Sequence, residues 1–182
     1  MMTRKSRLAA LGLTALGILA SAGAVAESRN VIDAGVTDAL TQFYAHSPKD
    51  RELADKAAGM LVFPSITKGG VGVAGEYGEG VLQVHGKTVG YYKVGGASIG
   101  LTLGVAKRSE VIMFMTQEAL DKFTQSKGWT VGVDAGVAVV SRGAGGEYDS
   151  KTLQKPILGF VYNEKGLIGD LSLKGSKISK LD

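Results

Sequence analysis

The sequence predicts an α+β protein built on a strongly curved, glycine-rich and mainly antiparallel sheet, or a small barrel-like sheet, of about eight strands with three helices. Apolar residues recur at helical spacing over residues 31–46, and strict two-residue alternation marks several later segments as strands. The segment 69–104 holds 12 glycines in 36 residues. Glycine inside a strand usually marks a bulge, a sharp bend or the close approach of another backbone, so these glycines predict curvature.

Local signals place the three helices. The first spans about residues 31–46. The second begins at Ser47-Pro48, because serine suits the N-cap and proline the first helical position, and it ends before Gly59. Thr116 caps the third. The apolar faces expected to point inward are Ile32, Val36, Leu40 and Phe43 in the first helix, and Ala119, Leu120 and Phe123 in the third.

The expected strands share one sequence pattern, in which apolar residues alternate with very small ones. This pattern appears from Ala97 to Val105 and again in one predicted strand from Trp129 to Val139. A hairpin turn is expected at residues 85–88, and another at 163–166 between strands 156–162 and 167–173. The residues assigned to the small face are Gly96, Ser98, Gly100, Gly132, Asp134 and Gly136. Close packing against this face is the favoured interpretation, and a ligand lying against bare backbone is the alternative.

The N-terminus has the three parts of a secretory signal peptide. Arg4, Lys5 and Arg7 give a positive start, residues 8–19 are apolar, and Ala24-Val25-Ala26 supplies small residues for a signal peptidase. We therefore expect residues 1–26 to be removed, which leaves residues 27–182 as one domain, helical over 30–58 and a sheet with one helix over 60–178. A periplasmic or secreted location follows. The chain has no cysteine, so it cannot be an acylated lipoprotein.

Charge and histidine content exclude several function classes. The chain carries 21 basic and 17 acidic residues, and three of the bases lie in the expected signal, so the mature part is close to neutral. Nucleic-acid binding requires a concentrated basic field, which is absent. Residues 96–100 match the nucleophile elbow around Ser98, but that motif needs a later histidine, and His46 and His85 both precede it. We expect no enzyme activity, no cofactor and no metal.

Several segments together resemble the SYLF domain, over about Lys56 to Ile178. They are 57–64 (AAGMLVFP), 68–74 (KGGVGVA), 94–100 (VGGASIG), 109–114 (SEVIMF), 119–123 (ALDKF) and 159–167 (GFVYNEKGL). No segment is specific alone, whereas their order and spacing are. The resemblance implies a lipid-binding or yeast-type actin-binding domain, here an exported bacterial member. It points to anionic phospholipid or a membrane surface as partner, and export would separate the chain from actin.

Six cations are candidates for contact with lipid headgroups. Three lie on the second helix among balancing acids, and three lie at predicted strand ends: Lys49, Arg51, Lys56, Lys68, Lys107 and Arg108. Asp134 on the small face would need a cationic partner if buried, which Lys107, Arg108 or Arg142 would supply. A small outer-membrane β-barrel and an envelope structural or interaction protein remain the alternatives.

Overall fold

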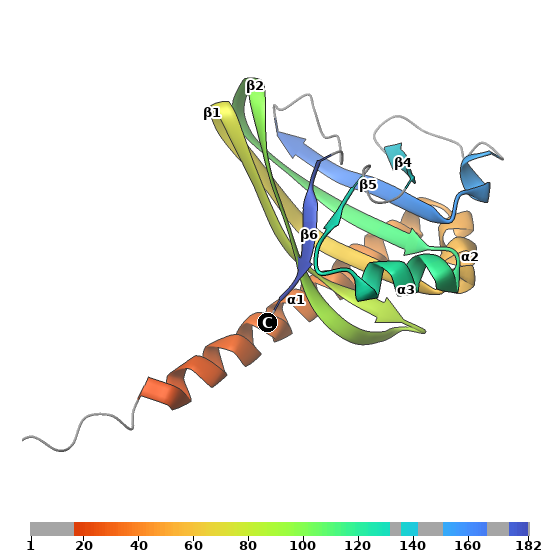
Figure 1. Ribbon diagram of the computed structural model, residues 1–182, viewed down its shortest axis with the longest axis horizontal. Coiled ribbons are helices and arrows are strands. Elements are labelled where there is room, and N and C mark those ends of the chain that lie inside the picture. The colour runs from red at the N-terminus through yellow and green to blue at the C-terminus, as the bar shows by residue number, and fades with distance from the viewer. Residues whose placement is uncertain (1–16, 132–135, 142–150, 167–174, 182) are drawn as a thin grey trace, which may run out of the picture.

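A long two-stranded ribbon organises the fold (Figure 1). The computed structural model describes residues 17–131, 136–141, 151–166 and 175–181. Strands β1 (Gly59–Val84) and β2 (Lys87–Phe114) pair antiparallel, from Gly59 opposite Phe114 to Val84 opposite Lys87. The turn at His85-Gly86 is the expected hairpin, and both of its residues have positive φ, 49° and 73°.

The ribbon then folds back on itself, which produces the predicted curvature (Figure 1). We call the residues at this fold, 69–75 of β1 and 97–105 of β2, the ribbon bend. Gly72 and Gly104 lie there with φ of 72° and 121°, values that side chains disfavour. A register shift between Val71 and Val73 marks the same place. Glycine is thus required where the paired strands change direction together.

Four further strands complete a curled mixed sheet. They are β3 (Trp129–Thr130), β4 (Val137–Ser141), β5 (Ile157–Gly166) and β6 (Lys177–Lys180). β5 pairs antiparallel with β2 and parallel with β4, while β6 lies antiparallel to both β2 and β3. The α+β class and the strong curvature predicted from the sequence are confirmed.

Two sequence predictions about strands are wrong. Residues 129–139 do not form one strand, because β3 hydrogen-bonds with β6 and β4 with β5. The expected turn at 163–166 is the end of β5, where Lys165 still faces Lys107. Asn163 has φ of 55° next to a register shift, so the turn-like sequence makes a β-bulge instead.

The sheet has a core on each face. On one face α1 (Gly17–His46) packs over a cluster around Phe43, Val62, Val111 and Phe160. On the other, α3 (Gln117–Gln125) covers a cluster that includes Phe63, Phe114 and Trp129. Alternate residues of β2 therefore serve different cores, as the two-residue period of a strand requires.

The helix predictions hold with one difference at the N-terminus. The side chain of Ser47 caps α2 (Pro48–Lys56) by accepting from the Lys49 amide, and Thr116 caps α3 by accepting from that of Ala119. The third helix buries the three residues expected of it. However, α1 begins at Gly17, and its N-terminal part extends away from the sheet (Figure 1). Among the described residues, no helix is both long and apolar enough to span a membrane.

Candidate functional site

The six candidate cations fall into exposed and buried groups. Lys49, Arg51, Lys56 and Lys107 are exposed, whereas Lys68 and Arg108 are 6% and 2% exposed. The two buried cations share the sheet face that α3 covers, because Lys68 lies opposite Ala106 and Arg108 opposite Ile66. A headgroup at the molecular surface has no access to them in this structure.

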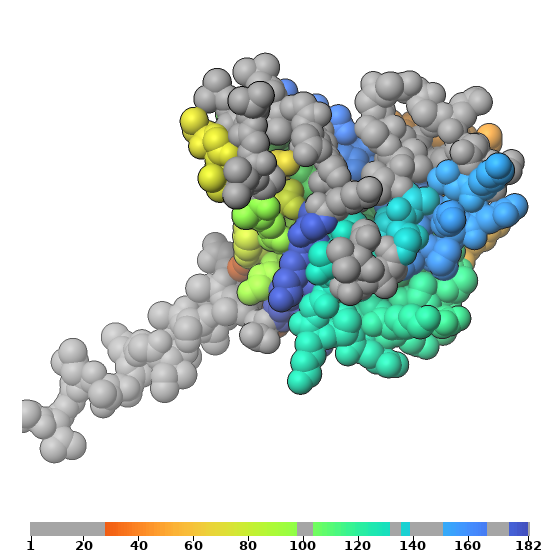
Figure 2. All heavy atoms as spheres, turned by 45° about the horizontal axis from the view of Figure 1, so that its top comes forward, coloured from red at the N-terminus to blue at the C-terminus, as the bar shows by residue number. Residues whose placement is uncertain are grey.

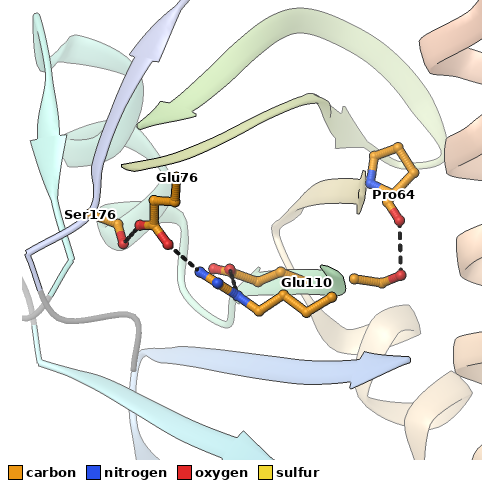
Figure 3. A network of polar contacts seen from close by, with 6 residues as sticks. Pro64, Glu76, Glu110 and Ser176 are labelled. Carbon is orange, nitrogen blue, oxygen red and sulfur yellow. Dashed lines mark hydrogen bonds and ion pairs between the residues drawn. The ribbon is translucent and has the colours of Figure 1, made fainter. Parts of the chain in front are cut away.

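Glu76, Glu110 and Ser176 belong to a buried ion cluster (Figure 3). Arg108 is its central cation. Its Nη2 donates to Glu76 Oε2 at 3.1 Å, and its Nε lies 3.8 Å from Glu110 Oε2. Ser176, next to β6, donates its hydroxyl proton to the other oxygen of Glu76. The expectation that Arg108 meets a headgroup is therefore corrected: two carboxylates surround its guanidinium, and its role is structural.

The cluster leaves polar atoms without hydrogen bonds. Arg108 Nε and Nη1 and Glu110 Oε2 are fully buried and lack a hydrogen-bond partner among the residues that the structure describes. Burial raises the pKa of Glu110 to about 7; Arg108 lowers this pKa and Glu76 raises it further. Because Arg108 is hydrogen-bonded to Glu76 and not to Glu110, the desolvation of Glu110 is only partly offset. Glu110 thus takes up a proton near neutral pH.

Lys107 lies on the opposite face and remains exposed. Its partner across the β2–β5 pair is Lys165, also exposed, so two lysines occupy directly opposed positions on adjacent strands. Within the described part of the chain neither lysine forms an ion pair. Like charges opposite one another destabilise a strand pair, so this arrangement is unfavourable unless an anion comes between them.

Sequence reasoning missed Lys165. It was placed in a presumed hairpin turn, whereas the bulge at Asn163 keeps β5 paired with β2 as far as Gly166. The sequence signal that could have predicted a longer β5 is the apolar run 157–162, whose length marks β5 as a buried strand beside a central partner.

The three cations of α2 form a different surface. Acidic neighbours Glu52 and Asp55 are exposed beside them, and the Arg51 guanidinium lies 4.7 Å from the centre of the Tyr44 ring. Figure 1 places α2 at the far side of the molecule from the ribbon bend. A flat membrane therefore cannot contact both surfaces at once, and the α2 surface is balanced in charge.

A groove of about 550 Å³ separates α1 from the outer face of β1. Its lining includes the carboxylates of Asp38 and Glu79 but no lysine or arginine. The Tyr77 hydroxyl donates to Glu79, which raises the pKa of Tyr77 to about 12. Two carboxylates and no cation make this groove unsuited to a phosphate headgroup.

The predicted small face is described only in part. A Cβ on Gly96 would lie 3.0 Å from Glu76 Oε1, so this glycine leaves room for the ion cluster. A Cβ on Gly136 would have no described atom within 4 Å. Ser98 and Gly100 lie in β2, where Ser98 is opposite Ala74 of β1, and nothing further is described of their surroundings. Gly132 and Asp134 lie outside the described residues, as does Arg142. Among the described residues no three potential metal ligands cluster.

Comparison with known families decides the identity of the fold. Residues 95–182 match the family model Ysc84, which is described as "Las17-binding protein actin regulator". The chain carries a SYLF-family domain. A comparison with curated proteins gives no match. The SYLF match confirms the family resemblance of the sequence, and it begins inside β2, so it covers both lysines and Arg108 but not β1 or α1.

The matched SYLF segment depends on residues that precede it. β2 pairs with β1 along its whole length, and the core around Phe114 includes Leu61 and Phe63 from β1. The Arg108 cluster likewise takes Glu76 from β1. The folded unit therefore extends to the N-terminal side of residue 95.

Proposed function

We propose that this protein is an exported, non-enzymatic SYLF domain, residues 27–182 after removal of residues 1–26, that binds anionic phospholipid or an anionic membrane surface. The observation that carries the proposal is the exposed pair Lys107 and Lys165 on adjacent strands, neither of which forms an ion pair with a described residue. A lipid phosphate bound between the two lysines would offset the repulsion between their positive charges.

The family supports a binding function rather than catalysis. The SYLF match names a regulator that binds another protein. Contact with actin would require a cytoplasmic location, which export denies. We therefore assign the membrane, not a cytoskeletal protein, as the partner of this domain.

Sedimentation with vesicles tests the proposal on the purified chain. Vesicles of phosphatidylcholine alone and of phosphatidylcholine with phosphatidylglycerol are compared, at low and high salt. We expect binding to the anionic vesicles that salt weakens. Each lysine near an anionic surface contributes about 1 kcal/mol, so Lys107→Gln/Lys165→Gln should lower the partition by roughly 30-fold.

The matched control is Lys49→Gln/Lys56→Gln, which removes the same charge from α2. Every variant keeps the same N-terminus, so any affinity of the apolar leader for lipid is common to all. Equal binding of both double variants, or greater loss in the α2 variant, would refute the assignment to β2 and β5. Equal sedimentation with neutral and anionic vesicles would refute the proposed lipid class.

Export is tested separately by the N-terminus of the protein recovered from the envelope fraction of cells that express the full chain. Intact-mass measurement should show that the chain begins at Glu27. A full-length protein retained in the cytoplasm would contradict this part of the proposal.

A further inference from the structure

The ribbon bend exposes apolar side chains in an unusual concentration. Val71, Val73 and Val105 are 77%, 58% and 60% exposed, among the largest values for apolar residues in the described chain. The bend contains no charged residue at all. Figure 2 shows part of this segment, in yellow, at the outer edge of the molecule. Exposed apolar groups gathered at one projecting edge mark an interaction surface.

The exposed valines continue the sheet face that carries the lysine pair. Val105 lies opposite Gly69 and Val71 opposite Leu103, so Val71 and Val105 share a face. Lys107 follows Val105 by two residues on that face, which places it about 7 Å farther from the bend. Helix α1 packs on the same face around Val111 and Met113 but leaves Val105 and Lys107 exposed.

This order of groups matches the depth profile of a membrane interface. The exposed valine side chains lie at the bend, and Lys107 and Lys165 lie one step behind them along the same face. Apolar groups enter the acyl boundary, while lysine resides at headgroup level. The charge complement of this surface is an anionic lipid headgroup.

We infer that the ribbon bend is a membrane-inserting tip: Val71, Val73 and Val105 enter the acyl boundary while Lys107 and Lys165 bind the headgroups above it. The inference rests on the proposed lipid binding and adds to it a location, an orientation and an apolar component. A purely electrostatic contact would need the lysines alone.

A fluorescent label distinguishes insertion from surface contact. The chain has no cysteine, so Val71→Cys creates one labelling site for an environment-sensitive dye such as NBD. On addition of anionic vesicles its emission should shift to the blue and rise several-fold, and lipids carrying a quencher in the upper acyl chain should suppress it. The matched site is Val89→Cys, since Val89 is 55% exposed but lies next to the His85-Gly86 turn. Its emission should not change.

A second set of variants measures the apolar contribution. Val71→Ser/Val73→Ser/Val105→Ser should lower the partition into anionic vesicles at least about tenfold, including at high salt, where the lysine contribution is screened. Val31→Ser/Val89→Ser removes exposed valines elsewhere and should bind like the parent protein. Because all five side chains are exposed, the thermal unfolding midpoints should stay close to that of the parent.

The outcomes separate the two proposals. Sedimentation with anionic vesicles but an unchanged Val71→Cys spectrum would overturn insertion and leave lipid binding intact. Absence of sedimentation would overturn both. A blue shift without vesicles that grows with protein concentration would show that the bend docks on a second copy of the chain, which also overturns insertion.

Discussion

Arg108 donates a hydrogen bond from Nη2 to Glu76 Oε2 at 3.1 Å, joining the two arms of the folded ribbon inside the protein. The side chains of Arg108 and Glu76 are 1% and 7% exposed. Removing one member of such a cluster leaves charge in a medium that solvates it poorly.

Arg108→Met should lower the free energy of unfolding by about 3–5 kcal/mol, because Glu76 and Glu110 would remain buried without a countercharge. Urea unfolding followed by circular dichroism measures this. Adding Glu76→Gln and Glu110→Gln to Arg108→Met should recover part of the loss, since the variant then buries no net charge. A stability of Arg108→Met equal to that of the parent would show that water reaches the cluster.

The stability of the parent protein should fall as the pH rises from about 4.5 to 7. The pKa of Glu110 is raised in the folded protein to about 7 from its ordinary value of 4.5. Between these values the folded chain holds a proton that the unfolded chain has released, so deprotonation favours unfolding. The full penalty, up to about 3 kcal/mol, applies above pH 7.

Glu110→Gln should remove this part of the pH dependence, because glutamine keeps the shape of the protonated acid and does not titrate. The variant should match the parent near pH 5 and exceed it in stability near pH 8. Urea midpoints measured at both pH values provide the comparison. Parallel pH profiles for the two proteins would contradict the raised pKa.

Gly80→Ala should destabilise the folded ribbon. A Cβ at this position would lie 2.1 Å from the carbonyl oxygen of Val62 and 2.7 Å from Phe63 Cδ1, so the two arms of β1 would have to separate. We expect a cost of about 2 kcal/mol or more in the free energy of unfolding. Gly75→Ala is the matched control, because no described atom lies within 4 Å of a Cβ at this position. Equal effects of the two substitutions would disprove the close approach.

Tyr162→Phe should loosen the contact between α1 and β5. The buried Tyr162 hydroxyl donates to the Ala39 carbonyl at 2.9 Å, and burial raises the pKa of this phenol, which keeps it neutral. Loss of the hydrogen bond should cost about 1 kcal/mol, with faster amide exchange in α1. Tyr92→Phe serves as the comparison, since Tyr92 is also buried but donates no hydrogen bond to a described residue. If Tyr162→Phe changes neither the free energy of unfolding nor amide exchange in α1, apolar packing alone holds α1 against the sheet.

Features determined by neighbouring residues were predictable from the sequence. The caps Ser47 and Thr116 and the His85-Gly86 turn were found because each acts over three or four residues. The curvature was predicted because glycines concentrate in one segment. The split between β3 and β4 was not, because the choice of partner strand depends on residues far away in the chain.

The burial of Arg108 was missed for a related reason. A cation next to a predicted strand end is usually exposed, and its partner Glu76 lies 32 residues earlier. A local signal did exist: Arg108 and Glu110 are in phase with Ile112 and Phe114, which line a core. Lys107, one residue away, is exposed because strand side chains alternate between faces.

The hairpin at His85-Gly86 also has a consequence for how the chain acquires its shape. This two-residue connection sets Val84 opposite Lys87, and the pairing of β1 with β2 then passes three register shifts before it reaches Gly59 opposite Phe114. A slip by one position in the arm next to the turn would exchange the two faces of the strand there. Inserting a single residue at the turn should therefore impair folding of this arm, whereas most surface loops tolerate such an insertion.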